Sequence, residues 1–533
     1  MPCLATSLSS ILVFFLCCNL SSGQNGENFV SIFDGKTLSG WDGKSGFWSV
    51  REGAITGQTT IQNPTEKNTF LIWRGGDVGN FELKLEYRVI ADNKEGFANS
   101  GIQYRSFEIQ GMPWVVGGYQ ADLEAGERFS GIFYGERSRG ILSDRGQETL
   151  LPFEGNPILV KTLGDPDKIQ SKIRQDDWNE YHIIANGYHF THKINGVVTA
   201  VMTDLGKVRR PRGILALQLH AGLPMTVQFR DIRVKPLLGE VGLSQSGKKK
   251  VVFVAGKRSH GYGAHEHYAG SLLLARSLLQ GRSDFRVDVT HDGWPDEESV
   301  FTGADTVVLY ADGGKRHPAL PKLETLDKLA RAGVGVVCLH YGTEVPREAA
   351  GYYFLKWIGG YFESDWSVNP HWVPRLINLA DHSITAGVSP FEVNDEWYYH
   401  MRFRDEMAGI VPILTALPGP DTLTRPDGSH SGNPHVRASV LERREPQHLA
   451  WAAERENGGR GFGFTGGHHH WNWGDTNFRR LVLNAIVWTA HAAVAENGVV
   501  DDGVGLEDLE SYQDYDPPQN YNREDVRIRF NLP

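Results

Sequence analysis

The stretch "FRDIRVKPLLGEVGLSQSGKKKVVFVAG" (residues 229–256) marks a change from one sequence pattern to another. Before it, short runs alternate apolar and polar residues, as half-buried strands do. After its polar segment, "VVFVAG" (251–256) is a continuous apolar run, which is typical of a strand buried on both faces. A chain of 533 residues is long enough for two or three domains. We therefore predict a linker over residues 238–250.

The N-terminal pattern predicts an antiparallel β-sandwich over residues 28–237. The run "FELKLEYRVI" (81–90) alternates apolar and polar residues, and "ILALQLH" (214–220) places its leucines on one face and its polar side chains on the other. Asn-Gly pairs at 186–187 and 195–196 separate three strand-like runs, and such pairs are a strong hairpin signal. Three antiparallel strands should follow one another there.

The C-terminal pattern predicts an α/β domain over residues 251–493. Strand-like runs begin at residues 251, 285, 305 and 333, and helical runs near 265–280 and 320–333 lie between strands. This alternation is typical of parallel βαβ units with helices on both faces of the sheet. Ligands of such sheets bind at the carboxyl ends of the strands. We therefore expect a site in the loops that follow these strands.

The charge of the chain is concentrated at its C-terminus. The formal net charge is -10, and residues 494–533 hold ten acidic residues against three arginines. Nothing in this balance indicates a nucleic-acid partner. We expect residues 494–533 to form an acidic extension that wraps the α/β domain or lies loose in solvent, rather than a calcium or partner site.

Residues 1–23 carry an apolar run at 11–20 and end in small residues, which predicts a signal peptide and an exported protein, periplasmic or extracellular. An uncleaved anchor is the alternative, whereas a bulky leucine before the cysteine pair disfavours lipidation. No other segment reaches transmembrane length, so no integral membrane domain is expected. Three of the four cysteines lie in this segment, which leaves Cys338 and no intrachain disulfide.

Several motifs resemble two known families. "FVSIFDGKTLSGW" (29–41) and "NSGIQYRSFEIQ" (99–110) resemble the 3-keto-disaccharide hydrolase family, a concanavalin-like jelly roll. "HGYGAHEHY" (260–268), "DEWYYHMRF" (395–403) and "GFGFTGGHHHWNW" (461–473) resemble the trehalose-utilisation (ThuA-like) family, which has a glutamine-amidotransferase-like, flavodoxin-like three-layer fold. Both resemblances imply an enzyme that cleaves 3-keto-glycosides or 3-keto-disaccharides, with a sugar as substrate and functional coupling to a sugar 3-dehydrogenase.

A sugar oxidised at C3 has a simple route to glycosidic cleavage. The 3-keto group acidifies the C2 proton, so a base at C2 and an acid at the glycosidic oxygen can break the bond by elimination, after which water adds. The site then needs one base, one acid and a donor for the enolate oxygen. We expect His220 to be the base, because its ordinary pKa lies near the working pH, and Arg105 to be the clamp for the enolate or a hydroxyl.

The other candidates lie on the polar strand faces, with Glu136 as a further catalytic residue. The full set is Gln103, Arg105, Gln120, Asp122, Tyr134, Glu136, Arg139, Gln218 and His220. An exposed strand face is polar without any function, so each residue also has a purely structural interpretation. A second alternative is a non-catalytic sugar-binding sandwich that relies on an aromatic platform and presents sugar to an α/β domain that carries the chemistry. The tryptophans for such a platform are Trp41, Trp48, Trp73 and Trp114.

The turn "VVCLHYGTE" (336–344) occupies the place of the nucleophile elbow in amidotransferases of this fold. Aligning the closing glycine puts His340 at the nucleophile position and leaves Cys338 two residues earlier, so glutamine hydrolysis is not expected. The resemblance places a late histidine opposite, which predicts that His468 faces His340. His469 and His470 should turn outward or pack on Trp471 and Trp473, while His260 and Glu396 complete a polar cleft. The alternative is a pocket that has lost its chemistry.

No cofactor is predicted. "VAGKRSHGYG" (254–263) follows a strand but is not G-x-G-x-x-G, which argues against NAD. A divalent metal ion is left open by two histidine groups, 260/265/267 and 468–470. Because adjacent residues of an extended chain point opposite ways, three consecutive histidines cannot all bind one ion. At most one or two of them should face inward.

Overall fold

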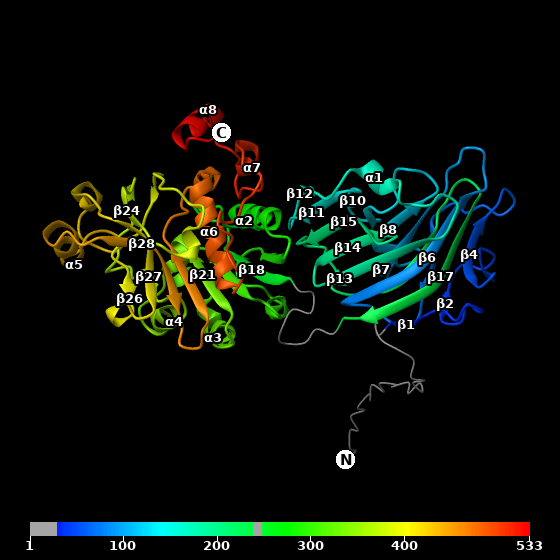
Figure 1. The fold of residues 1–533 in the computed structure, drawn as a ribbon, viewed down its shortest axis with the longest axis horizontal. Coiled ribbons are helices and arrows are strands. Elements are labelled where there is room, and N and C mark those ends of the chain that lie inside the picture. The colour runs from blue at the N-terminus through cyan, green and yellow to red at the C-terminus, as the bar shows by residue number, and fades with distance from the viewer. Residues whose placement is uncertain (1–28, 238–247, 533) are drawn as a thin grey trace, which may run out of the picture.

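The computed structural model describes residues 29–237 and 248–532, which form two domains side by side (Figure 1). A β-sandwich comes first and an α/β domain follows it, as the sequence predicts. The predicted signal peptide and most of the predicted linker lie outside the described residues. No helix in the described part of the chain has both the length and the apolar character that crossing a bilayer requires.

The sandwich consists of two sheets that enclose one apolar core. The ten-stranded sheet has the order β12 (Ile158–Thr162), β11 (Gln147–Leu151), β15 (Val197–Asp204), β14 (His189–Ile194), β13 (Asn179–Asn186), β6 (Phe81–Ala91), β17 (Met225–Pro236), β4 (Ala54–Thr59), β3 (Trp48–Arg51), with β1 (Val30–Ser31) also paired to β17. The seven-stranded sheet has the order β10 (Gly140–Ser143), β9 (Phe133–Glu136), β8 (Val116–Glu124), β7 (Asn99–Glu108), β16 (Ile214–Leu219), β5 (Thr69–Trp73), β2 (Trp41–Asp42). The short helix α1 (Pro166–Gln170) lies between β12 and β13.

Period-two alternation builds these sheets. Every second residue of β6 is buried in the core, and the residues between are half-buried. Both Asn-Gly pairs form the predicted hairpins, because β13, β14 and β15 follow one another in antiparallel register. The backbones of Gly187 and Gly196 have φ of +59° and +80°, which glycine adopts without steric cost. The hairpin predictions are therefore confirmed.

The α/β domain is a three-layer structure around an eight-stranded sheet. The strand order is β19 (Phe285–Thr290), β18 (Lys249–Ala255), β20 (Thr306–Tyr310), β21 (Gly335–Leu339), β29 (Arg460–Phe464), β28 (Gln447–Glu454), β27 (Ile410–Ala416), β24 (Leu376–Leu379). One face packs on α2 (His267–Gly281) and α6 (Thr476–Thr489), the other on α3 (Leu323–Arg331) and α4 (Ala349–Ile358). The described chain also has the helix α5 (Pro434–Arg437) and two small ribbons, β22 (Gly360–Tyr361) with β26 (Arg402–Phe403) and β23 (His371–Trp372) with β25 (Asp395–Glu396).

Only part of this sheet has the predicted parallel order. The strands from β19 to β29 pair in parallel, but β28, β27 and β24 continue the sheet in antiparallel pairs. For the pair β28 and β29 the cause is local, since only residues 455–459 connect these strands. A connection this short permits an antiparallel pair and excludes the crossover that parallel strands need. The sheet of this α/β domain is thus mixed, with parallel and antiparallel strands.

The two domains share apolar contacts. Leu150, Val160 and Leu205 of the sandwich belong to the same buried cluster as helix α2. The ring of Phe153 stacks on His291 with 4.4 Å between centroids, and its backbone N–H donates to the hydroxyl of Tyr268. The sandwich and the α/β domain are therefore joined by packing as well as by the chain.

The C-terminal extension is docked on the α/β domain and is not merely extended. It contains the helices α7 (Leu506–Glu510) and α8 (Arg523–Arg529), which Figure 1 shows at the edge of this domain. Leu509 and Leu532 are buried in the main apolar cluster of the domain. Asp501 binds the buried Arg479 through two hydrogen bonds, at 2.6 and 2.9 Å. The expectation that the segment wraps the domain is met, but the two helices were not predicted.

We expect Asp501→Ala to lower the free energy of unfolding by about 3–5 kcal/mol, because it leaves the guanidinium of Arg479 buried without its carboxylate. Asp502→Ala is the matched control, since Asp502 is exposed and adjacent. Denaturant titrations of both variants measure the difference. Equal stabilities would show that the ion pair does not hold the extension in place.

Candidate functional site

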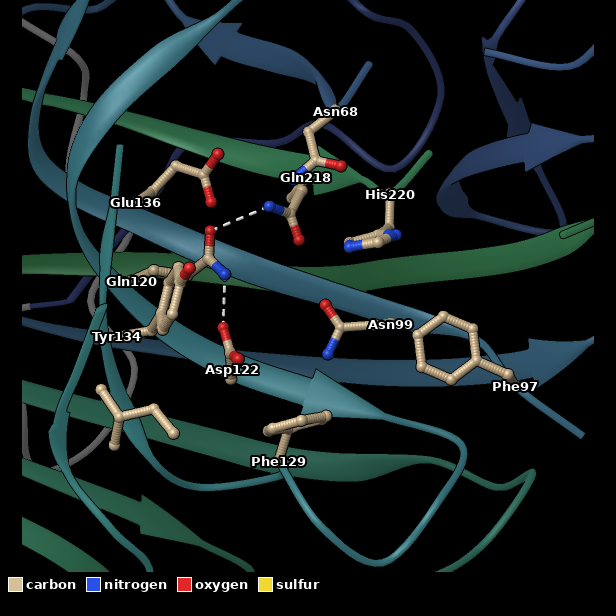
Figure 2. Close-up of a pocket in the computed structure, with 11 residues that line it drawn as sticks. Asn68, Phe97, Asn99, Gln120, Asp122, Phe129, Tyr134, Glu136, Gln218 and His220 are labelled. Atoms are coloured by element: carbon tan, nitrogen blue, oxygen red, sulfur yellow. Dashed lines mark hydrogen bonds between the residues drawn. The ribbon is translucent and has the colours of Figure 1, made fainter. Parts of the chain in front are cut away.

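A cavity of about 200 Å³ opens on the outer face of the seven-stranded sheet (Figure 2). Five adjacent strands, β10, β9, β8, β7 and β16, supply its floor, and the connections before β5, β7 and β9 and after β16 supply its rim. Its lining residues are Asn68, Phe97, Asn99, Gln120, Asp122, Phe129, Tyr134, Glu136, Ile141, Gln218 and His220. Polar groups and a few rings thus share one small space.

Strand alternation explains why these residues meet. In β8, Tyr119 and Leu123 enter the core between the sheets, whereas Gln120 and Asp122 face the cavity. Gly101 of the neighbouring strand β7 lies opposite Asp122 in the register. A Cβ at this glycine would stand 2.4 Å from the Cδ of Gln120, so any larger residue would displace the glutamine side chain. Gly101 therefore provides the space that Gln120 needs.

A chain of amides orients the carboxyl group of Asp122. Gln218 donates from Nε2 to Oε1 of Gln120 at 3.0 Å, and Gln103 donates to the same oxygen from beneath the cavity. Gln120 in turn donates from Nε2 to Oδ1 of Asp122. The direction of every hydrogen bond is fixed, because each amide nitrogen donates and each oxygen accepts. Asp122 is consequently held toward the cavity by its neighbours.

Burial sets the protonation of the two acidic groups. Burial raises the pKa of Asp122 to about 8, and the nearby carboxylates of Glu136 and Glu124 add to this shift. Burial likewise raises the pKa of Glu136 above its ordinary value. Asp122 therefore keeps its proton near neutral pH and can act as a general acid.

His220 has the opposite character. Its Nδ1 lies 2.5 Å from the backbone oxygen of Ala221. A carbonyl oxygen only accepts, so Nδ1 carries the hydrogen and Nε2 keeps its lone pair. Burial lowers the pKa of the imidazole, which favours the neutral form. His220 thus has the properties of a general base.

Arg105 does not reach this cavity, which corrects its prediction as the enolate clamp. Its side chain is fully buried, donates to the backbone oxygens of Gly79 and Gly187, and lies over the ring of Phe190. The physical cause is a bulge in β7 after Tyr104, where Arg105 takes a positive φ of +46°. Such a bulge breaks the alternation that the prediction assumed.

Two further predicted residues and the aromatic platform also lie elsewhere. Arg139 binds the buried carboxylate of Asp204 and borders a different hollow. Gln103 lies beneath the cavity and supports Gln120 without lining it. None of the four predicted tryptophans lines the cavity, whose rings are those of Phe97, Phe129 and Tyr134. A tryptophan platform therefore does not form at this site.

Five lining residues were not predicted from the sequence: Asn68, Phe97, Asn99, Phe129 and Ile141. Asn99 begins the strand that carries the motif at 99–110, so its place on the polar face was readable from the alternation. Ile141 is an apolar residue of β10, and the other three lie in connections between strands. No periodicity applies there, and only the folded chain brings them to the cavity.

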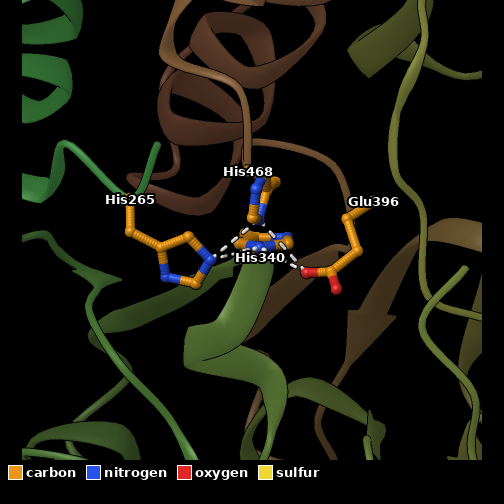
Figure 3. A group of neighbouring side chains, drawn as sticks. All are labelled: His265, His340, Glu396 and His468. Carbon is orange, nitrogen blue, oxygen red and sulfur yellow. Dashed lines mark hydrogen bonds and ion pairs between the residues drawn. The ribbon is translucent and has the colours of Figure 1, made fainter. Parts of the chain in front are cut away.

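A second polar cluster lies at the carboxyl edge of the α/β sheet (Figure 3). It consists of His265 from the loop after β18, His340 at the end of β21, His468 after β29, and Glu396 of β25. Since β18, β20, β21 and β29 are neighbours in the sheet, the loops that follow them meet. This is the edge at which the sequence analysis expected a site.

The side chains of this cluster are in direct contact. Nε2 of His265 lies 3.0 Å from Nδ1 of His468 and 3.1 Å from Nε2 of His340. Oε2 of Glu396 lies 3.2 Å from Nδ1 of His468 and 3.5 Å from Nε2 of His340. The hydroxyl of Tyr398 lies 3.1 Å from the same His340 nitrogen. Imidazole and carboxylate groups of this kind can bind a cation or the hydroxyls of a sugar.

Backbone conformation and neighbouring charged groups fix the residues of this cluster. His340 has a positive φ of +49°, which matches the strained elbow expected at this turn. The carboxylate of Asp395 accepts from the backbone N–H groups of Gly467 and His468, at 2.8 and 3.0 Å. Burial tends to raise the pKa of Glu396, but the two histidines beside it hold that pKa well below its ordinary value. Glu396 is thus ionised.

The structure places the predicted residues of this domain as follows. His340 and His468 face one another, with 5.5 Å between ring centroids, and His260 stacks on His265. His470 is buried beside Trp471, whereas His469 lies against Phe530 of the extension. His371 and Tyr398 border the cluster and were not predicted. Their positions depend on the long segment between β21 and β28, which has no simple period.

Cys338 is not available as a nucleophile. It is fully buried in the apolar cluster on the α3 and α4 face, and burial raises the pKa of its thiol. His340, by contrast, begins the 3-10 turn after β21 and belongs to the polar cluster. The expectation that no cysteine nucleophile operates here agrees with this burial.

Each of the two domains matches a known family model. Residues 28–235 match the family model described as a 3-keto-alpha-glucoside-1,2-lyase-like domain. Residues 250–489 match the family model described as trehalose utilisation. The sandwich is thus a 3-keto-disaccharide hydrolase-like domain, and the second domain is ThuA-like. A comparison with curated proteins finds no match.

Solved structures resemble each half of the chain. A "putative glycosyl hydrolase" from Parabacteroides distasonis is 16% identical over 39% of this chain and 94% of its own, with a TM-score of 0.26. The carbohydrate binding module CBM66 from Bacillus subtilis is 15% identical over 37% of this chain and 95% of its own, with a TM-score of 0.25. A "putative thua-like protein" from Parabacteroides merdae is 16% identical over 50% of this chain and 100% of its own, with a TM-score of 0.32.

The raised pKa of Asp122 predicts a pH-dependent stability. The ordinary value is 3.8 and the folded value is about 8. Between these values the unfolded chain has released a proton that the folded chain still holds, so stability falls as the pH rises. Asp122→Asn removes the ionisation and keeps an acceptor for Gln120. Relative to the wild type, we expect this variant to gain at least about 1 kcal/mol between pH 5 and pH 8 in denaturant titrations.

Asp176→Asn is the control for this experiment, because Asp176 is exposed. Its stability should follow that of the wild type at every pH. If the Asp122→Asn variant also runs parallel to the wild type, the carboxyl group is ionised in the folded protein and the assignment of Asp122 as an acid is wrong.

Proposed function

We propose that the sandwich cavity cleaves 3-keto-glycosides or 3-keto-disaccharides at the glycosidic bond by elimination followed by hydration. One pairing supports this proposal most: Asp122, a buried acid with a pKa of about 8, lines the same cavity as His220, an imidazole with a lone pair on Nε2. The family model matched by the sandwich is described as a lyase-like domain, and this description agrees with an elimination.

In the first step, Nε2 of His220 removes the proton from C2 of the sugar. The electron pair of the C2–H bond moves toward the carbonyl at C3 and gives an enolate. The amide of Asn99, which borders the cavity in place of the expected arginine, supplies a hydrogen-bond donor for the enolate oxygen. No oxocarbenium ion is needed, because the electron pair of the negatively charged enolate, and not the ring oxygen, drives the later cleavage at C1.

In the second step, the enolate forms a C1–C2 double bond and the C1–O bond to the leaving group breaks. Asp122 donates its proton to the departing oxygen, so that the aglycone leaves as an alcohol. The negative charge of Glu136 favours the protonated form of Asp122, which keeps the acid ready for this donation. Glu136 thus acts through Asp122, as a positioning residue.

Hydration restores both groups. Water adds to C1 of the unsaturated ketone and gives its proton to the carboxylate of Asp122, while C2 takes back the proton that His220 holds. The products are the 3-keto sugar and the aglycone, and each residue returns to its starting state. Since the substrate must already carry a carbonyl at C3, we propose that a sugar 3-dehydrogenase supplies it, and that the protein is exported to meet such glycosides.

The alternative is a sandwich that only binds sugar and presents it to the ThuA-like domain, where the histidine cluster carries the chemistry. The absence from the cavity of the tryptophan platform that this alternative would use favours catalysis.

We expect His220→Gln and Asp122→Asn to lower kcat for release of 4-nitrophenol from its 3-keto-glucoside at least about 100-fold. In D2O, the wild-type product should carry deuterium at C2, because the imidazolium of His220 exchanges its proton with solvent before C2 is reprotonated. His182→Gln is the control, since His182 lies on a strand of the opposite sheet and should keep full activity. Release and isotope content are read by absorbance and mass spectrometry.

Two results would contradict the proposal. Equal cleavage of the unoxidised glucoside would exclude a mechanism that starts at C2. Activity that survives His220→Gln but disappears in Glu396→Gln would move the chemistry to the ThuA-like domain, as in the alternative.

A further inference from the structure

We infer that His265, His340, His468 and Glu396 form a binding site for one divalent transition-metal ion, independent of the sandwich cavity. The site lies at the carboxyl edge of the α/β sheet, where four segments far apart in sequence bring their side chains together (Figure 3). Three imidazoles and one carboxylate are a donor set that suits zinc and its neighbours in the first transition series.

The spacing of the donor atoms fits a single ion. Four contacts form a closed ring: 265 to 340 at 3.1 Å, 340 to 396 at 3.5 Å, 396 to 468 at 3.2 Å, and 468 to 265 at 3.0 Å. All four donor atoms lie within 4.8 Å of one another. For metal–ligand bonds of 2.0–2.1 Å, neighbouring ligands should be about 3.3 Å apart in a tetrahedron and about 2.9 Å in an octahedron. The observed distances span these values.

The tautomers leave two lone pairs facing each other. Nδ1 of His340 lies 2.9 Å from the backbone oxygen of Thr465, and Nδ1 of His265 lies 3.3 Å from a carboxylate oxygen of Asp312. Both partners accept, so both Nδ1 atoms carry hydrogen and both Nε2 atoms are bare. With 3.1 Å between them, these two lone pairs are placed to bind one cation. A metal ion satisfies both, together with the adjacent carboxylate.

The surroundings resemble those of established metal sites. A ligand histidine usually donates its other N–H to a carboxylate or a backbone carbonyl, which fixes the ring and its tautomer. Here Asp312 does this for His265 and Thr465 for His340. Glu396 is oriented by Asn369, whose Nδ2 donates to Oε1 at 2.9 Å and leaves Oε2 toward the ring of donors. Each of these three ligands is therefore preorganised.

Access to the ion is possible from one side only. The side chains of His265 and His340 are 1% and 0% exposed, whereas those of Glu396 and His468 are each 13% exposed. Beside them, the side chain of His371 is 48% exposed. Further ligands would reach the ion along this side, and they would be oxygens of water or of a sugar carbonyl or hydroxyl group.

The test uses the full chain, purified without nickel resin, stripped with chelator and dialysed against Zn²⁺ or Co²⁺. We expect about one equivalent of metal per chain by elemental analysis, and visible absorption bands from bound Co²⁺. His340→Ala and the near-isosteric Glu396→Gln should weaken Zn²⁺ binding at least about 10-fold, and Asp312→Asn should weaken it by about 10- to 100-fold. His435→Ala is the control, because His435 is exposed and remote from the donor ring.

Circular dichroism shows whether each variant is folded. If His340→Ala does not fold, Zn²⁺ binding by Glu396→Gln is the deciding measurement. Less than a tenth of an equivalent in the wild type, at Zn²⁺ concentrations that saturate ordinary sites, would overturn the inference. So would unchanged binding in both Glu396→Gln and His340→Ala. Loss of binding in His371→Ala or His469→Ala, with Glu396→Gln unaffected, would place the ion at the adjacent histidines and overturn this ligand assignment.

Discussion

The alternation of side chains along a β-strand links the cores of this protein to its two sites. Successive side chains of a strand point to opposite faces of its sheet, so one set is buried in the core and the other set faces away from it. In β8 this separates Tyr119 in the core from Asp122 in the cavity. In β21 it sends Val337 and Cys338 to different helix layers, until the strand ends at His340. In both sites, a rigid sheet holds polar residues at positions that the alternation, or the end of a strand, keeps out of the apolar core.

The same constraint explains how much the sequence predicts. Six of the predicted sandwich residues line one cavity, because their positions depend only on the alternation and on pairing between neighbouring strands. Arg105 departs from the pattern because a bulge turns it inward, and a bulge has no reliable sign in a single sequence. The hairpins at the two Asn-Gly pairs were predictable since glycine there needs a positive φ. The antiparallel strands β28, β27 and β24 were missed because the prediction rested on the parallel βαβ pattern of the strands that begin at 251, 285, 305 and 333.

The histidine cluster shows a different limit. His340 and His468 could be paired by the resemblance of their turns to those of a known fold, but the contact of His265 with both depends on how three loops cross above the sheet. Tyr398 and His371 lie in the long segment between β21 and β28, whose path does not follow any sequence periodicity. Tertiary packing thus decided the composition of this site, while strand order decided its location.

The shared apolar contact between the domains has a thermodynamic consequence. Because Leu150, Val160 and Leu205 belong to a buried cluster that includes helix α2, each domain covers part of the apolar surface of the other. Melting of one domain would strip apolar cover from the other and lower its stability at the same temperature. Heating should therefore produce one cooperative calorimetric transition rather than two. Cleavage of the linker would therefore not by itself yield two independent folding units.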